Sequence, residues 1–158
     1  PNAAHKKLAE WEAEGRLKAV ITQNIDGLHQ AAGSRNVLEL HGSVHRNHCQ
    51  RCGKFYGLEH ILRTEGVPRC SCGGIIKPDV VLYEEGLDQG TLEAAVRALA
   101  EADMLMIGGT SLNVYPAAGL IRYYQGHRLV LLNKSPVARD LAADLVITDP
   151  IGETLAQL

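Results

Sequence analysis

Two short stretches of the sequence place polar, chemically capable side chains directly after apolar runs. Two amides and a carboxylate follow residues 17–21, and an imidazole follows residues 37–40. Buried strands of a parallel sheet end in this way where they meet a ligand crevice. Amide, carboxylate and imidazole groups together suit recognition of a sugar and a carboxamide, with proton transfer. The side chains concerned are those of Gln23, Asn24, Asp26 and His41.

The same residues also fit a purely structural interpretation. Asn24 and Asp26, which precede Gly27, have the composition of an ordinary polar turn. A turn of this kind needs no ligand, so both interpretations stay open on these residues alone.

Four cysteines form two close pairs, Cys49 with Cys52 and Cys70 with Cys72, separated by seventeen residues. This spacing is typical of a zinc ribbon, in which each tight turn supplies two thiolates. Free structural thiols and a redox pair are the alternatives. Four thiolates complete a tetrahedron, so a zinc ion bound here is structural and has no open position for chemistry. Three nearby histidines are further candidate ligands: His45, His48 and His60.

The rest of the chain predicts strands that alternate with helices. Apolar runs predict strands at residues 17–21, 37–40, 104–107, 129–132 and 145–147, and helical spacing predicts helices at 2–14, 28–32, 88–102, 116–124 and 152–158. Residues 75–83 are expected to be extended, and Pro78 excludes a central position in a sheet. The alternation predicts an α/β fold, a Rossmann-like doubly wound parallel sheet into which residues 44–74 are inserted as a small zinc-ribbon module.

A glycine-rich turn follows the predicted strand at 104–107. Gly109, Thr110 and Ser111 lie between that strand and the next helix, an arrangement that brings backbone N–H groups to a phosphate. The same residue types also occur in plain turns. Asn133 and Lys134 follow the strand at 129–132, where a polar residue suits a ribose, although Lys134 equally fits a solvated loop.

Length and composition exclude several classes of protein. The chain has 158 residues, a net charge of −2 and few aromatic residues, so neither strong attraction to nucleic acid nor base stacking is expected. No apolar run approaches the ~20 residues of a membrane span. Cysteines paired at a metal-type spacing indicate a reducing compartment, and we predict a cytoplasmic location.

Together these motifs resemble the signature of the sirtuins, which are NAD-dependent protein-lysine deacylases. The resemblance rests on Thr-Gln-Asn-Ile-Asp-Gly-Leu-His at 22–29, Glu-Leu-His-Gly at 39–42 and Gly-Thr-Ser-Leu-x-Val-x-Pro-Ala-Ala at 109–118. It implies that residues 1–43 and 75–158 form a Rossmann-like NAD-binding domain, with NAD as co-substrate and one structural zinc ion in the inserted module. It also implies an acyl-lysine protein or peptide substrate, converted to free lysine with nicotinamide and O-acyl-ADP-ribose as the other products.

The resemblance also implies a role for each candidate residue. His41 is the implied general base. The implied substrate-binding residues, beside the acyl-lysine tunnel, are Val80, Val81, Leu82 and Tyr83. The implied NAD contacts are Gln23, Asn24, Ile25, Asp26, Gly109, Thr110, Ser111, Asn133, Lys134 and Ile151. The implied zinc ligands are Cys49, Cys52, Cys70 and Cys72.

The sequence departs from the sirtuin pattern in two places. Residues 83–85 read Tyr-Glu-Glu where sirtuins usually have Phe-Gly-Glu, which bears on substrate preference. The family's opening Gly-Ala-Gly-x-Ser loop and Pro-x-Phe-Arg segment have no match, so we expect the chain to derive from a longer protein or to be completed by another polypeptide. Two other functions therefore remain candidates: mono-ADP-ribosyl transfer to protein, and a catalytically inactive zinc- and nucleotide-binding module.

Overall fold

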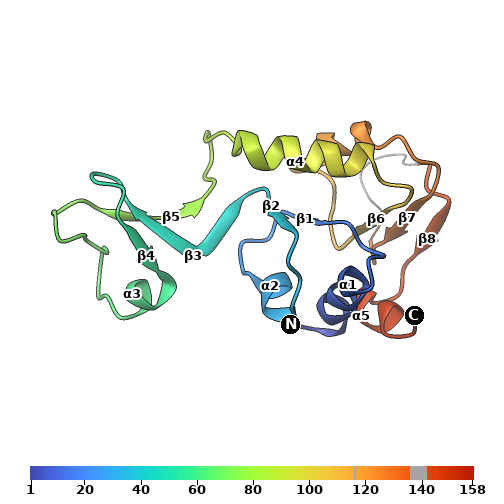
Figure 1. Cartoon of the computed structure of the whole chain (residues 1–158), viewed down its shortest axis with the longest axis horizontal. Coiled ribbons are helices and arrows are strands. Elements are labelled where there is room, and N and C mark those ends of the chain that lie inside the picture. Colours follow the sequence, from blue (N-terminus) through green and yellow to red (C-terminus); the bar gives the residue numbers. More distant parts are fainter. Residues whose placement is uncertain (116, 136–141) are drawn as a thin grey trace. The chain divides into compact units, whose positions relative to one another are not determined.

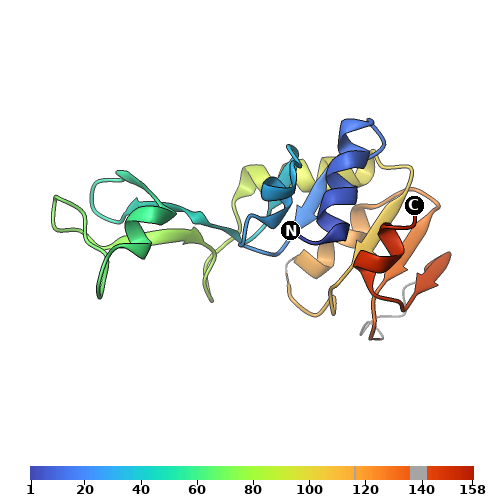
Figure 2. The same ribbon diagram turned by 90° about the horizontal axis from the view of Figure 1, so that it is seen from below.

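The computed structural model describes residues 1–115, 117–135 and 142–158, which fall into two compact units. The first unit comprises Pro1–Ile21, Leu28–Leu38 and Gln89–Leu158, and the second comprises Thr22–Gly27 and Glu39–Asp88. Figures 1 and 2 show the helices and strands of each unit in two orientations. The domain boundaries predicted after residues 43 and 74 remain a prediction.

The first unit contains a three-stranded parallel sheet with the strand order β6-β7-β8. The strands are β6 (Leu105–Gly108), β7 (Leu129–Leu132) and β8 (Leu145–Ile147). The central strand β7 contributes the buried side chains of Leu131 and Leu132. Parallel strands with a helical connection between β6 and β7 confirm the predicted α/β, Rossmann-like class.

The helices of the first unit pack around a small apolar core. They are α1 (Ala3–Ala13), α2 (Leu28–Ala32), α4 (Gln89–Ala100), the 3-10 helix η1 (Ala117–Tyr123) and α5 (Ile151–Leu155). The side-chain oxygen of Asn2 accepts the N–H of His5 at 3.1 Å and so caps α1. Ala4 and Trp11 on α1 pack with the fully buried Leu155 of α5. Burial of these side chains holds α5 against α1.

A two-stranded sheet pairs β1 (Val20–Thr22) with β2 (Val37–Glu39). The bonded pairs at its two ends are Val20 N–H to the Asn36 carbonyl (3.0 Å) and Leu40 N–H to the Thr22 carbonyl (2.9 Å). This pairing means that the two strands run in the same direction. Parallel strands bring their carboxyl ends to one edge, so the residues after β1 and the residues after β2 emerge together.

Two elements differ from the prediction. β1 begins later than expected, because the N–H of Leu17 donates to the Trp11 carbonyl at 3.0 Å and closes the end of α1. The helix predicted over residues 116–124 is a 3-10 helix over Ala117–Tyr123, and Pro116 lies outside the described residues. Its end is closed by the N–H of Tyr124, which donates to the Ile121 carbonyl at 3.0 Å with the three-residue spacing of a 3-10 helix.

The second unit contains a three-stranded antiparallel sheet with the strand order β4-β3-β5. Its elements are β3 (Gly42–Cys49), β4 (Phe55–Gly57), the short helix α3 (Leu58–Leu62) and β5 (Ile76–Val80). The pairing of β3 with β5 shifts register between Ser43 and Asn47, where the ladder of the two strands is irregular. Pro78 lies on the edge strand β5, where a missing N–H is tolerated, so its exclusion from a central position is confirmed.

We expect Gly42→Ala to destabilise the second unit by about 3 kcal/mol or more. Gly42 has a φ of +77°, and a Cβ built there would overlap the backbone carbonyl oxygen of Asp79. The left-handed backbone alone costs about 1–2 kcal/mol for a residue with a Cβ, and the steric overlap adds to that cost. The measurement is the free energy of unfolding from denaturant titration.

Gly66→Ala is the matched control for this substitution. Gly66 has a φ of +73°, yet a Cβ there meets nothing within 4 Å. This variant should therefore lose only the cost of the backbone conformation. Equal losses for the two variants would show that the approach of Asp79 to Gly42 does not contribute.

Candidate active site and metal centre

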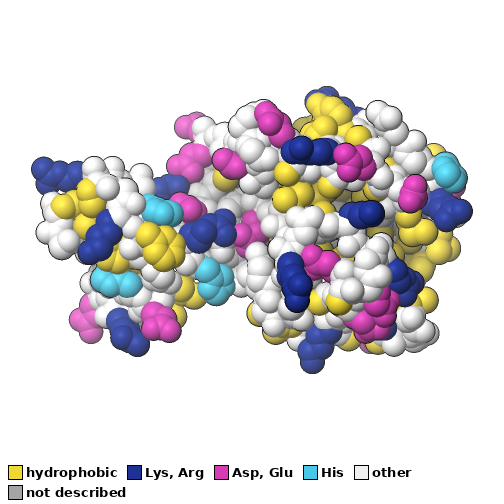
Figure 3. Space-filling model, viewed as in Figure 1, with side chains coloured by type: hydrophobic (Ala, Val, Ile, Leu, Met, Phe, Trp, Pro, Cys, Tyr) yellow, Lys and Arg dark blue, Asp and Glu magenta, His cyan; other side chains and the backbone are white. Residues whose placement is uncertain are grey.

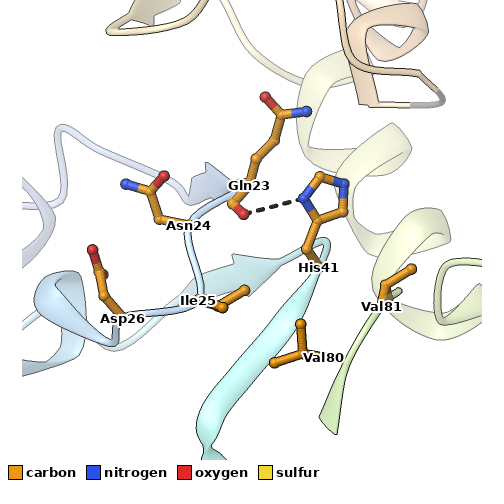
Figure 4. A pocket seen from close by; sticks show the side chains of 7 residues that line it. All are labelled: Gln23, Asn24, Ile25, Asp26, His41, Val80 and Val81. Carbon is orange, nitrogen blue, oxygen red and sulfur yellow. Dashed lines mark hydrogen bonds between the residues drawn. The ribbon is translucent and has the colours of Figure 1, made fainter. Parts of the chain in front are cut away.

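A cavity of about 440 Å³ lies in the second unit, at the end of β2 and beside β5 (Figure 4). We refer to it as the first pocket. Its lining residues are Gln23, Asn24, Ile25, Asp26, His41, Val80 and Val81. The polar residues after the two apolar runs therefore share one pocket. The role of each of them in the pocket remains a prediction.

The loop that follows β1 is held by hydrogen bonds to its backbone carbonyl groups. The bonded pairs are His41 Nδ1 with Gln23 (3.1 Å), Val44 N–H with Ile25 (3.1 Å) and His45 Nε2 with Asp26 (3.0 Å). Three carbonyls fixed at successive points leave the loop little freedom. The side chains of the loop are thereby presented to the pocket without any contribution from a ligand.

The contact between His41 and Gln23 also fixes the chemistry of the imidazole. A carbonyl oxygen only accepts hydrogen bonds, so in the neutral ring the proton lies on Nδ1 and is donated to Gln23. The other ring nitrogen, Nε2, then carries the lone pair. An imidazole oriented in this way can accept a proton from a substrate group at Nε2. Figure 4 shows the ring facing the Gln23 backbone.

Of the four residues predicted to bind substrate, only two line the pocket. Val80 and Val81 do so, and the N–H of Val81 donates to the His41 carbonyl at 3.0 Å. Leu82 and Tyr83 lie outside the lining and are exposed to solvent, Tyr83 completely. The segment thus runs from the pocket out to the surface along the edge of the sheet.

The four cysteines lie together in the second unit as free thiols. Their sulfur atoms all lie within 4.8 Å of one another. The sulfur–sulfur distances include 3.5 Å for Cys49–Cys72, 3.6 Å for Cys52–Cys70 and 3.5 Å for Cys52–Cys72. Zinc–sulfur bonds of ~2.3 Å place the ligands of a tetrahedron about 3.8 Å apart, so the cluster fits the metal. The four cysteines are positioned to bind one structural zinc ion.

The surroundings of Cys70 favour the thiolate, which is the form that binds metal. The backbone N–H of Cys72 and the hydroxyl of Tyr56 both donate to the Cys70 sulfur, the hydroxyl at 3.0 Å, and they lower the pKa of Cys70 to about 5. Tyr56 lies on β4, whose pairing with β3 brings it to the sulfur. Its hydroxyl is a contact that the cysteine spacing alone could not indicate.

The histidines near the cysteines have other partners among the described residues. His45 contacts the loop after β1, as given above. His48 Nδ1 lies 2.9 Å from a carboxylate oxygen of Asp79, and the His60 ring lies 4.5 Å from that of Tyr56. Among the described residues, the group of side chains that could hold a metal ion consists of the four cysteines and includes no histidine.

The second pocket lies in the first unit and has a volume of about 840 Å³. Six predicted residues line it: Gly109, Thr110, Ser111, Asn133, Lys134 and Ile151. Nine further lining residues were not predicted: Asn2, Ala3, Leu132, Ser135, Asp149, Pro150, Gly152, Glu153 and Ala156. Asp149 and Pro150 follow the end of β8, so the strand-end rule would have found them. Asn2 and Ala3 reach the pocket through the packing of α1 on α5, which no local pattern reveals.

The surface of the second unit is mixed in character. On the face shown in Figure 3, its Lys, Arg and His side chains lie among exposed hydrophobic ones. Among the described residues, no helix has both the length and the apolar character needed to cross a membrane.

Comparison with known proteins identifies the relatives of the chain. The model of the Sir2 family matches residues 1–116. The NAD-dependent protein deacetylase of Clostridium acetobutylicum is 62% identical over 157 residues, covering 98% of this chain and 64% of that protein. The NAD-dependent protein deacetylase of Cutibacterium acnes is 56% identical over 156 residues, covering 99% and 64%. A solved structure of "Sir2 bound to acetylated peptide" matches with a TM-score of 0.91 at 40% identity, covering 99% of this chain and 68% of that one.

The parallel α/β sheet and the four-cysteine centre define an α/β protein with a site for one structural zinc ion. The chain belongs to the Sir2 family, because the family model covers most of its length and the curated relatives are up to 62% identical to it. The predicted resemblance to the sirtuins is thereby confirmed. The chain spans 64% of the length of the two curated relatives named here.

Proposed function

We propose that this protein is an NAD-dependent protein-lysine deacetylase. The observation that carries the proposal is the first pocket, in which one oriented imidazole lies beside two amides and a carboxylate. The names of its relatives, NAD-dependent protein deacetylases, support the same activity. The reaction would yield free lysine, nicotinamide and O-acyl-ADP-ribose.

In this proposal the first pocket binds the reacting end of NAD. Asp26 and the backbone of Ile25 bind the carboxamide of nicotinamide, and Gln23 contacts the adjoining ribose. Asn24 stabilises positive charge that develops at the ribose carbon as nicotinamide leaves. His41 accepts a proton from a ribose hydroxyl at Nε2, because Nδ1 is engaged by the Gln23 carbonyl.

The second pocket would bind the remainder of NAD. The turn at Gly109, Thr110 and Ser111 offers backbone and hydroxyl groups to phosphate, and Gly109 holds a left-handed φ of +63° that suits glycine. Asn133 and Lys134, directly after β7, would contact the adenosine ribose. Ile151 would contact adenine through its backbone.

The other parts of the proposal concern substrate, metal and location. The edge strand β5 and the residues after it would pair with an extended acyl-lysine peptide.

The zinc ion would stabilise the second unit and take no part in the chemistry, since four thiolates leave no open position. Four reduced cysteines grouped at a candidate metal site favour a cytoplasmic location.

The test is release of nicotinamide from NAD by the intact protein with an acetyl-lysine peptide, using the unacetylated peptide as the matched control. We expect release that requires the acetyl group and is accompanied by O-acetyl-ADP-ribose. ADP-ribose attached to the peptide would instead indicate ADP-ribosyl transfer. Folded, zinc-loaded protein that releases no nicotinamide would contradict the proposal.

A further inference from the structure

The segment that leaves the first pocket along the sheet edge is not held in place by packing. Val80 and Val81 line the pocket, but Leu82 is 53% exposed and Tyr83 is fully exposed. Apolar side chains that remain half or fully exposed contribute little to fixing a backbone, since they lose little contact with water on folding. Polar contacts must therefore give residues 81–85 their shape.

Two charged residues supply those contacts. The ammonium of Lys77 lies 3.1 Å from Glu85 Oε2, and the same oxygen accepts the N–H of Leu82 at 2.9 Å. The ammonium also donates to the Val80 carbonyl at 3.0 Å. The N–H of Glu85 in turn donates to the Leu82 carbonyl at 3.1 Å. Lys77 and Glu85 thus join the last residue of β5 to both ends of the turn at 82–85.

The turn needs such support because its backbone is strained. Glu84 has a φ of +71°, a left-handed conformation that is unfavourable for a residue with a Cβ. The hydrogen bond from the Leu82 N–H, followed by the hydrogen bond from the Lys77 ammonium, lowers the pKa of Glu85 and so favours the carboxylate. A hydrogen-bonded carboxylate with two donors can offset the strain at its neighbour.

We refer to Lys77 and Glu85, with their contacts to residues 80–82, as the clamp. The clamp also determines which backbone groups beside the first pocket remain available to a bound peptide. It occupies the Val80 carbonyl and the Leu82 N–H, while the Val81 N–H is bonded to the His41 carbonyl. Among the described residues, the Val81 carbonyl between them has no backbone or side-chain donor. An extended peptide that pairs with this segment would find that one carbonyl ready to accept its N–H.

We propose that Lys77 and Glu85 are positioning residues that hold residues 80–83 in the shape required to bind an acyl-lysine peptide. This inference rests on the proposed function and adds to it two residues outside the pocket lining. An isolated exposed ion pair would contribute little, but this pair also binds two backbone groups, the Val80 carbonyl and the Leu82 N–H. Its effect is expected on peptide binding, because neither side chain lines the pocket where the reaction would occur.

The test compares Glu85→Ala, Lys77→Met and the double variant in the intact protein. Each single variant should raise the Kd of an acetyl-lysine peptide about fivefold, which corresponds to about 1 kcal/mol. The double variant should be no worse than either single one, because the two residues act through each other. KM for the peptide should rise in parallel, while kcat at saturating peptide stays within about twofold of wild type. Hydrogen exchange at the Leu82 amide should accelerate in these three variants. Lys77→Arg, which keeps the positive charge, should bind the peptide as the wild-type protein does.

Glu84→Gln is the matched control, since it removes a carboxylate from the adjacent residue, for which the described residues include no ion-pair partner. It should leave the peptide Kd unchanged. Additive losses in the double variant, or a fall in kcat with an unchanged KM, would overturn the clamp, as would a peptide Kd that no variant changes. A wild-type protein that binds no acetyl-lysine peptide would overturn the proposed function itself, and the clamp's role with it.

Discussion

We expect His41→Ala to lower kcat for deacetylation by about 100- to 10,000-fold, the usual contribution of a general base. The imidazole of His41 is the side chain of the pocket lining whose ring is oriented by a hydrogen bond so that Nε2 can accept a proton from substrate. The Gln23 carbonyl holds its Nδ1, so no other group of the lining can replace Nε2. The measurement is steady-state formation of O-acetyl-ADP-ribose in the intact protein.

The matched control for this variant is His48→Ala. His48 is an imidazole on β3 that pairs with Asp79 and does not line the pocket. The His48→Ala variant should retain the kcat of the wild-type protein. The His41→Ala variant should bind the acetylated peptide with an affinity close to that of the wild-type protein. If His41→Ala kept more than a tenth of wild-type kcat, another group would have to act as the base.

Removing the zinc ion should unfold the second unit. Binding of structural zinc contributes on the order of 10 kcal/mol in small zinc domains, about as much as the whole stability of a typical domain. The buried core around the cluster consists of Cys49, Cys70 and Ile76, and two of these are themselves ligands. Cys70→Ser should therefore abolish zinc retention and the hydrogen-exchange protection of β3, β4 and β5. Zinc content and exchange are the two measurements.

Ser71→Ala provides the control for the cysteine substitution. Ser71 lies between the two ligands of the second pair and is exposed, so this variant changes the same turn without removing a thiolate. It should keep one zinc ion per chain and normal protection. Cys70→Ser protein that lost zinc but kept the protection of β3 would show that the sheet is stable without the metal.

The sequence was most informative where the signal is local. The cysteine spacing indicated the metal centre, because two tight turns bring their thiolates together whatever the rest of the fold does. The polar residues after β1 and β2 indicated the first pocket, because parallel strands end at one edge. Pro78 indicated an edge strand because the missing N–H makes a central position unfavourable.

Features that depend on residues far apart were not predictable. The contact of Asn2 with the second pocket requires α1 to lie against α5, and nothing near residue 2 encodes that packing. The pairing of Lys77 with Glu85 depends on the turn around Glu84, whose positive φ is unusual for glutamate. The apolar pattern also did not show that η1 is a 3-10 helix. The 3-10 helix and the α-helix differ by one residue in the spacing of their hydrogen bonds, and over one or two turns the sequence pattern does not distinguish them.

The contact of Trp11 with Leu155 has a consequence for how the chain is made. At roughly 5–20 residues per second, the ribosome adds Leu155 on the order of ten seconds after Trp11. Glu39–Asp88 emerges as one continuous stretch during that interval and carries all four cysteines. Zinc uptake should therefore come before closure of the first unit, and until then the apolar face of α1 is open to chaperones on the nascent chain.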